Sequence, residues 1–182
     1  MQHADHVWLI EAGIVRGSGG VWADFGSGSG AFTLALRDMA GPDVEIWSVD
    51  RDAGALRSQQ AAMERQFPGT RLHLSVGDFS RPLALPPLDG IVAANAIHYV
   101  RDRATLLSGW RAFLKPTGRL ILVEYDSDEG NRWVPYPVSF RSLPALADAA
   151  GYESPQLLGV YPSRFLDRIY AASLDLAAAG RA

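Results

Sequence analysis

The sequence predicts a single compact domain of the α/β class, in which a parallel sheet carries helices on both faces. Short apolar runs that are typical of buried strands alternate with longer segments of helical spacing, which is the pattern of successive βα units. A glycine-rich turn follows the first clear run, as in doubly wound sheets that bind nucleotides. A length of 182 residues, 48% of them hydrophobic, suits one core.

The first βα unit is the clearest. Residues 21–25 form an apolar run, the turn 26–30 contains three glycines, and residues from 31 to 39 have the spacing of a helix. Gly41 and Pro42 end this helix, since neither residue continues helical geometry well.

The next units repeat this order. A strand over 44–49 closes on Asp50, a helix over 53–66 ends before a proline and a glycine, and a strand over 72–76 leads to Asp78. The chain therefore places an acidic residue just after each of these two strands.

A fourth strand, 90–94, leads into Asn95, and a helix over 104–114 follows it. The segment 115–118 contains a proline and a glycine, which stop this helix before a fifth strand over 119–124.

The last third of the chain is less regular. Residues 125–137 are rich in aromatic, charged and proline residues, 140–150 return to helical spacing, and 157–161 and 165–171 are strand candidates. We expect three parts, which are a helical segment or lid at 1–20, the α/β domain at 21–175 and a frayed tail at 176–182.

Composition excludes several classes of function. The chain has no cysteine, so disulfides, thiolate ligands and thiol nucleophiles are absent, and we expect no metal site. A net charge of −3 with scattered basic residues argues against nucleic acid as a partner. No apolar run of about 18 residues suggests a membrane span, and the first ten residues lack the pattern of a secretory signal. We therefore expect a cytoplasmic protein.

The glycine turn predicts a ligand site with an amine-bearing ligand. Missing side chains let a ligand approach the backbone between a strand and a helix. Asp24 lies two residues before the first glycine, where a carboxylate repels a pyrophosphate but holds an ammonium group. A turn of this kind also occurs for purely structural reasons and in dinucleotide-binding proteins.

The acids after the next strands extend this site. Asp50 is placed to accept hydrogen bonds from both hydroxyls of a ribose, Asp78 to accept from an adenine amino group, and Phe79 to cover the ring. Each acid alone also fits a helix cap or a solvated turn. Because the carboxyl ends of parallel strands meet at one crevice, we expect the acids to converge there.

These motifs resemble the class I S-adenosylmethionine-dependent methyltransferase family, over about 21–125. Residues 24–30 (DFGSGSG) resemble its first motif, Val49-Asp50 its ribose-binding acid and Gly77-Asp78-Phe79 its adenine-binding segment. Residues 94–100 (ANAIHYV) are similar to the fourth motif of the small-molecule, quinone-biosynthesis-like branch, and 114–120 to the turn before the fifth strand.

The resemblance implies a Rossmann-like, doubly wound seven-stranded sheet that is mostly parallel and has an antiparallel last strand. It implies S-adenosyl-L-methionine as cofactor, S-adenosyl-L-homocysteine as product and a small-molecule acceptor. The residues that it assigns to the cofactor are Asp24, Phe25, Gly26, Ser27, Gly28, Gly30, Asp50, Arg51, Asp78, Phe79 and Asn95.

The sequence departs from other branches of this family. Asn95 is not followed by the Pro-Pro-Tyr of amino-group methylases, which disfavours adenine or glutamine as acceptor. The lack of cysteine excludes the covalent route to cytosine carbon, and Lys115, the only lysine, excludes a lysine-containing tetrad. The short segment before the first strand leaves the pocket open or closed by a partner subunit, so a homodimer is one alternative.

Two other functions compete with methyl transfer. A nicotinamide-dependent oxidoreductase would share the glycine turn and Asp50, but Arg111 stands where its short-chain version needs a tyrosine four residues before Lys115. A non-catalytic S-adenosylmethionine-binding protein would keep the same glycines and aspartates.

The acceptor side is predicted from fewer signals. His98 is the candidate general base, because its ordinary pKa of about 6.5 suits proton transfer near neutrality. A histidine at this position is also commonly structural. The residues that we expect to line the acceptor side, or else to form a packed surface loop, are Tyr99, Tyr125, Arg132, Trp133 and Tyr136.

Overall fold

The computed structural model describes residues 1–163 and 165–178. Within them, seven strands form one sheet in the order β3-β2-β1-β4-β5-β7-β6. The first five strands in this order, from β3 to β5, are parallel to one another, whereas β7 is antiparallel to both β5 and β6, which confirms the predicted sheet. The strands are β1 (Val21–Phe25), β2 (Glu45–Asp50), β3 (Arg71–Val76), β4 (Leu88–Ala94), β5 (Leu114–Tyr125), β6 (Gln156–Pro162) and β7 (Arg168–Asp175).

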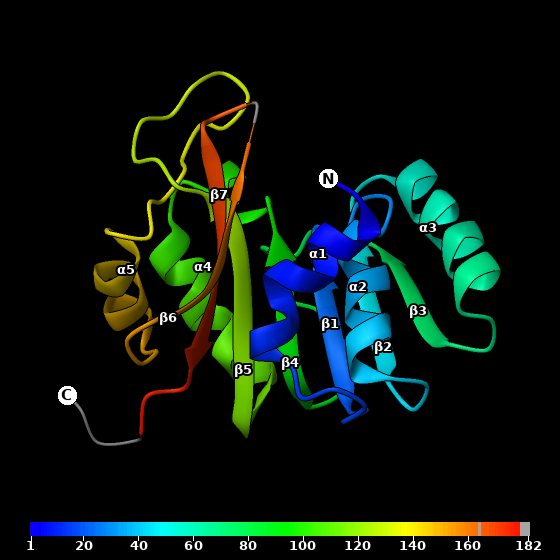
Figure 1. Ribbon diagram of the computed structural model, residues 1–182. Coiled ribbons are helices and arrows are strands. Elements are labelled where there is room, and N and C mark those ends of the chain that lie inside the picture. The colour runs from blue at the N-terminus through cyan, green and yellow to red at the C-terminus, as the bar shows by residue number, and fades with distance from the viewer. Residues whose placement is uncertain (164, 179–182) are drawn as a thin grey trace.

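Helices cover both faces of this sheet, and Figure 1 shows α1 and α2 on the viewer's side. In β5, Ile121 and Val123 pack with α1 and α2, whereas Leu120 and Leu122 pack with α4 and α5. This alternation follows from the two-residue period of a strand. The helices are α1 (His3–Ile10), α2 (Ala31–Ala40), α3 (Ala53–Gln66), α4 (Arg103–Trp110) and α5 (Leu143–Ala150), with 3₁₀ turns η1 (Glu11–Gly13), η2 (Ile97–Tyr99) and η3 (Arg111–Phe113).

Acidic side chains cap the N-termini of two helices, α3 and α4. Asp52 accepts hydrogen bonds from the backbone N–H groups of Gly54, at 2.7 Å, and Ala55, at 3.1 Å, before α3. Asp102 accepts from the N–H of Thr105 at 3.0 Å before α4. These caps satisfy N–H groups that a helix start leaves unpaired.

The helix predicted over 104–114 and the strand predicted over 119–124 have different bounds. The α-helix ends at Trp110, and β5 already begins at Leu114 because that residue pairs with Leu88 of β4. Between this pair and the next one the register shifts, so residues 115–118 form an irregularity inside β5 and not a turn before it. The Lys115 ammonium, 2.8 Å from Asp89, anchors that irregularity to β4.

The last strand lies later than predicted. Residues 165–167 precede β7, and Asp167 has a φ of 60°, outside strand geometry. β7 continues to Asp175 because it pairs with β5 down to Arg119. Of the predicted tail 176–182, Leu176 bridges Tyr152 and residues 179–182 lie outside the described part.

The N-terminal helix α1 packs against α2 and β6. The His6 ring lies 4.9 Å from that of Phe32, and Trp8 lies against Gly159. The helix α1 is therefore packed on the sheet and on α2. No helix among the described residues has the length and apolar character needed to span a bilayer.

Candidate ligand site at the carboxyl ends of the strands

The glycine turn presents bare backbone to the crevice. Gly28 has a φ of 53°, a left-handed conformation that favours glycine, and no atom lies within 4 Å of where its Cβ would be. Its N–H donates to Oδ2 of Asp50 at 2.7 Å. At Gly30, with a φ of 91°, an added Cβ would fall 2.4 Å from Cγ of Gln59, so α3 packs directly on the turn.

A buried polar network holds the turn from below. Gln59, fully buried on α3, accepts from the Ser27 hydroxyl at 3.2 Å and donates to the Thr33 hydroxyl at 2.7 Å. Thr33 in turn donates to Oδ2 of Asp24 at 2.5 Å. In this chain of bonds Oδ2 of Asp24 is the final acceptor.

Asp24 is nearly fully buried at the end of β1. Its Oδ1 atom has no hydrogen-bond partner among the described residues. Burial raises the pKa of Asp24 to about 7, with a contribution from the Asp50 charge, although the hydrogen bond from Thr33 favours the ionised form. An unsatisfied buried carboxylate oxygen is costly, and a ligand ammonium group would satisfy it.

Asp50 and Asp78 lie at neighbouring strand ends but differ in surroundings. Asp50 lines a cavity at the glycine turn, and its carboxylate also accepts a hydrogen bond from the N–H of Asp52 at 2.8 Å. Asp78 is held by Arg51 at 2.6 Å and by Ser80. Burial disfavours the charged form of Asp78, but the hydrogen bonds from Ser80 and the Arg51 ion pair outweigh it and lower its pKa to about 2.

A cavity of about 220 Å³ joins several of the sequence-predicted residues. It is lined by Gly26, Asp50, Arg51, Phe79, Asn95, Ala96, Tyr99 and Val100. Asp24, Ser27, Gly28, Gly30 and Asp78 are not among its lining residues. The Phe25 side chain is part of the core, 4.9 Å from the Trp110 ring, so it is not at the surface of the cavity.

Asn95 stands where this cavity meets two others. It has a φ of 51°, which asparagine tolerates better than most residues, and its buried Oδ1 has no partner among the described residues. Besides the cavity at the glycine turn, it lines one of about 280 Å³ and one of about 890 Å³. Asn95 therefore lies between the cavity at the glycine turn and the two other cavities.

His98 forms a buried pair with a residue that the sequence analysis did not select. Glu124, fully buried at the end of β5, accepts from Nδ1 of His98 at 2.8 Å and from the N–H groups of Ile97 and His98. Because the carboxylate accepts, Nδ1 carries the hydrogen, and in the neutral imidazole Nε2 then keeps a free lone pair. Nε2 has no partner among the described residues, and His98 lines the 280 Å³ cavity.

One signal in the sequence could have identified Glu124. It is the single acid in the predicted strand 119–124, and a buried acid requires a hydrogen-bonded partner. The partner itself, His98, is 26 residues away along the chain and is brought close by the pairing of β4 with β5.

The predicted acceptor-side residues divide into two groups. Tyr99, Tyr125 and Trp133 line the 280 Å³ cavity. Arg132 and Tyr136 line none of the three cavities: the Arg132 guanidinium lies 5.6 Å from the Trp133 ring, and the Tyr136 N–H donates to the His98 carbonyl at 2.9 Å.

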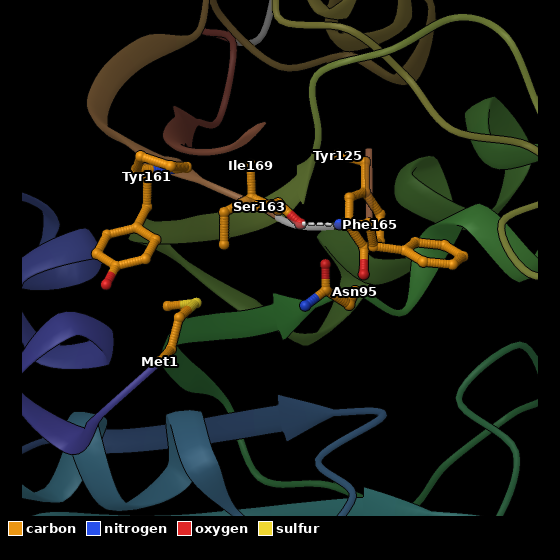
Figure 2. Close-up of a pocket in the computed structure, with 8 residues that line it drawn as sticks. Met1, Asn95, Tyr125, Tyr161, Ser163, Phe165 and Ile169 are labelled. Carbon is orange, nitrogen blue, oxygen red and sulfur yellow. Dashed lines mark hydrogen bonds between the residues drawn. The ribbon is translucent and has the colours of Figure 1, made fainter. Parts of the chain in front are cut away.

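The largest of these three cavities lies between β4, β5 and the β6–β7 hairpin, as Figure 2 shows. Asn95, Tyr125 and Phe165 lie on one side of this hollow, with Tyr161 and Met1 across from them. Sequence reasoning treated Tyr161 and Phe165 only as parts of strands, because their approach to Asn95 depends on the hairpin. The lining residues are Met1, Asn95, Tyr125, Tyr161, Pro162, Ser163, Phe165 and Ile169.

Comparisons with known proteins agree on one class of enzyme, the methyltransferases. A family model described as "Methyltransferase domain" matches residues 23–120. Among curated proteins, one from Thermoplasma volcanium described as "Probable cobalt-precorrin-6B C(15)-methyltransferase (decarboxylating)" is 28% identical over 105 residues, which are 58% of this chain and 51% of that protein. The chain thus spans about half the length of this curated relative.

Solved structures share the fold at low identity. The 1,6-didemethyltoxoflavin-N1-methyltransferase of Burkholderia thailandensis, solved with S-adenosylhomocysteine, has a TM-score of 0.74 and 18% identity over 97% of this chain and 78% of its own. The YcgJ protein of Bacillus subtilis has a TM-score of 0.69 and 14% identity over 94% and 96%. A mitomycin 7-O-methyltransferase, of which this chain covers 53%, has a TM-score of 0.68 and 16% identity.

Proposed function

The chain belongs to the class I S-adenosylmethionine-dependent methyltransferase family, and on this premise we propose that it methylates a small-molecule acceptor that gives up a proton to His98. The observation that carries the proposal is the cavity at the glycine turn, which is lined by Gly26, Asp50 and Asn95, together with the buried and unpartnered Oδ1 of Asp24 at the end of β1.

The residues present fit this cofactor. The free Oδ1 of Asp24 suits its ammonium group, Asp50 suits its ribose hydroxyls, and the open space at Gly28 allows close approach to the backbone. When bound, S-adenosylmethionine supplies a methyl group on a positively charged sulfur, an already activated leaving group. The chain's own task is then to orient the acceptor and exclude water.

The His98–Glu124 pair supports a base on the acceptor side. Glu124 fixes the tautomer in which Nε2 accepts a proton, and its negative charge stabilises the imidazolium that results. His98 lines a cavity that shares Asn95 and Tyr99 with the cofactor cavity. A proton taken at Nε2 would thus come from a group beside the methyl donor.

Binding of S-adenosylhomocysteine by calorimetry tests the cofactor assignment. A hydrogen bond to a charged group contributes about 1.5 to 3 kcal/mol, so Asp50→Ala should weaken the affinity by about tenfold or more. Asp50→Asn, which keeps one acceptor oxygen, should lose less. Asp148→Ala, an exposed residue of α5, is the control. An Asp50→Ala variant that folds and binds like the parent would refute this assignment.

A further inference from the structure

The space beyond Asn95 is lined by aromatic rings. Tyr99, Tyr125, Trp133 and Phe165 line the 280 Å³ cavity together with His98, and the 890 Å³ cavity shares Tyr125 and Phe165 with it. None of the described residues that line either cavity has an aspartate, glutamate, lysine or arginine side chain.

Three of these rings, those of Tyr99, Tyr125 and Phe165, come from separate segments and form tilted pairs with one another or with His98. The rings of Tyr125 and Phe165 lie 5.6 Å apart at 58°, and that of His98 lies 4.2 Å from Tyr99 and 5.8 Å from Tyr125. Tyr99 follows β4, Tyr125 ends β5, and Phe165 lies in the β6–β7 connection. Edge and tilted contacts of this kind recur between aromatic groups, so a planar ring would find several partners here.

Three of the aromatic side chains are unusually exposed. The exposed fractions are 63% for Tyr99, 65% for Trp133 and 47% for Phe165. Large apolar side chains that are exposed together at one opening are typical of a binding site, whereas single exposed apolar side chains are not. A flat ligand would bury them, at about 25 cal/mol for each Å² of apolar surface removed from water.

Charge argues for a neutral ligand. An anion buried in the 280 Å³ cavity would need a cationic partner, and no arginine or lysine of the described residues lines it; the Arg132 guanidinium lies 5.6 Å from the Trp133 ring but is not part of the lining. A cation would lack a free carboxylate, since Glu124 already accepts from His98 and two backbone N–H groups. Burying a charge without a partner is costly.

The base sets the acidity of the reacting group. An aromatic hydroxyl has a pKa of about 10, as in tyrosine, within a few units of an imidazole. A hydroxyl with the acidity of water has a pKa of about 15.7, which is far above the pKa of an imidazole. Proton transfer to Nε2 of His98 is therefore feasible from an aromatic hydroxyl and much less so from an aliphatic one.

We propose that the acceptor is a neutral, planar aromatic compound whose hydroxyl is presented to Nε2 of His98 by the rings of Tyr99, Tyr125, Trp133 and Phe165. The inference rests on the proposed function. The hydroxyl oxygen forms the new bond to the methyl carbon while the carbon–sulfur bond breaks, the electron pair of that bond goes to sulfur, and the hydroxyl proton goes to Nε2.

Equilibrium dialysis with matched probes, in the presence of saturating S-adenosylhomocysteine, tests the ligand class. We expect 2-naphthol to bind about tenfold more tightly than decahydro-2-naphthol, its saturated counterpart, since aromatic pairs add about 0.5 to 1.5 kcal/mol each beyond buried area. 2-Naphthol should also bind more tightly than 6-hydroxy-2-naphthoate, which is an anion, and 2-naphthyltrimethylammonium, which is a cation that aromatic faces could attract. Equal or tighter binding of any of these three overturns the proposal.

Variants then locate the probe. Phe165→Ala and Trp133→Ala should weaken 2-naphthol several-fold, whereas Leu157→Ala, an exposed apolar residue that lines neither cavity, should not. His98→Phe should abolish the preference for 2-naphthol over naphthalene, because only the former offers a hydroxyl to Nε2. A preference that survives in His98→Phe contradicts the proposed orientation.

The two proposals fail in different ways. If S-adenosylhomocysteine does not bind in the calorimeter, the proposed function is wrong. If it binds normally while 2-naphthol shows no preference over the other probes, the cofactor assignment stands and only the aromatic acceptor is excluded.

Discussion

Asp24 is the residue at which burial and ligand chemistry are most closely linked. Its carboxylate is nearly fully buried, one oxygen is held by Thr33, and the other has no partner among the described residues. Because the pKa of Asp24 is raised in the folded protein, the free energy of unfolding falls as the pH rises from the ordinary value of 3.8 to about 7. In this range the unfolded chain is ionised at Asp24 and the folded one is not. A ligand ammonium would recover that cost by favouring the ionised form.

The affinity for S-adenosylhomocysteine should therefore rise with pH up to about 7 and then level off. Below that pH, binding requires the release of a proton from Asp24, which lowers affinity by up to about tenfold per pH unit. Thr33→Val removes a hydrogen bond that lowers the pKa, so the midpoint should move to higher pH. Calorimetry across this range measures it, and a flat profile in the parent protein would rule out this role for Asp24.

Glu124 acts through His98 and is a positioning residue. In Glu124→Gln, the amide oxygen can still accept from the backbone, but the amide NH₂ faces Nδ1 and favours the tautomer with hydrogen on Nε2. Loss of a general base lowers a rate by about 10² to 10⁴-fold, while cofactor affinity should not change.

Nitrogen NMR of the imidazole tests this without an acceptor. We expect an unprotonated Nε2 in the parent protein and a protonated one in Glu124→Gln, with Glu153→Gln, an exposed acid, as control. A parent protein whose neutral His98 carries its hydrogen on Nε2 would exclude the base role.

At the scale of elements, the glycine turn is a contact between β1, α2 and α3. Gln59 of α3 reaches Ser27 in the turn and Thr33 in α2, so the helix after the second strand supports the loop after the first. The register of β1 with β2 sets this contact, since Phe25 lies opposite Val49 and the two strands end together.

Substitution of Gly30 tests this packing. Gly30→Ala combines a left-handed φ of 91° with a Cβ 2.4 Å from Gln59. Gly69→Ala is the matched control, because Gly69 has a φ of 80° with no atom within 4 Å. A left-handed conformation alone costs about 1 to 2 kcal/mol, and overpacking adds about 1 to 3 kcal/mol. Urea unfolding should show the extra loss only for Gly30→Ala, and equal losses would show that Gln59 moves aside freely.

At the scale of the whole molecule, one sheet joins the proposed cofactor side to the proposed acceptor side. The cavity at the glycine turn lies over the ends of β1, β2 and β4, whereas the aromatic cavity lies over β4, β5 and the β6–β7 hairpin. Both halves share the two apolar clusters that line the faces of the sheet. We therefore expect the described domain to unfold as a single cooperative unit.

Ligand binding should stabilise this unit. At a concentration of 100 times the Kd, S-adenosylhomocysteine adds about 2.7 kcal/mol, which raises Tm by roughly 5 to 10 °C for a chain of this size. Calorimetry should show one transition that moves as a whole, and Asp50→Ala should lose most of the shift. A second transition that does not respond to the ligand would separate the domain into two units.

Much of the site could be anticipated because it is local in sequence. The glycines, Asp50 and Asn95 follow strands directly, so a strand–turn–helix pattern is enough to place them at one edge of the sheet. Glu124, Tyr161 and Phe165 were missed because their roles depend on neighbours that are distant along the chain. Arg132 and Tyr136 were selected by composition, which does not define where a loop side chain lies.

The sequence by itself determined the class of fold and predicted the cofactor side, because both predictions follow from periodicity and from turns whose geometry only glycine adopts easily. Only the tertiary structure decided which groups are buried together: the His98–Glu124 pair, the unsatisfied oxygen of Asp24 and the ring of aromatic side chains around one cavity. The physical reason is that burial, pKa and cavity shape depend on contacts between segments far apart in the chain, and strand register sets those contacts.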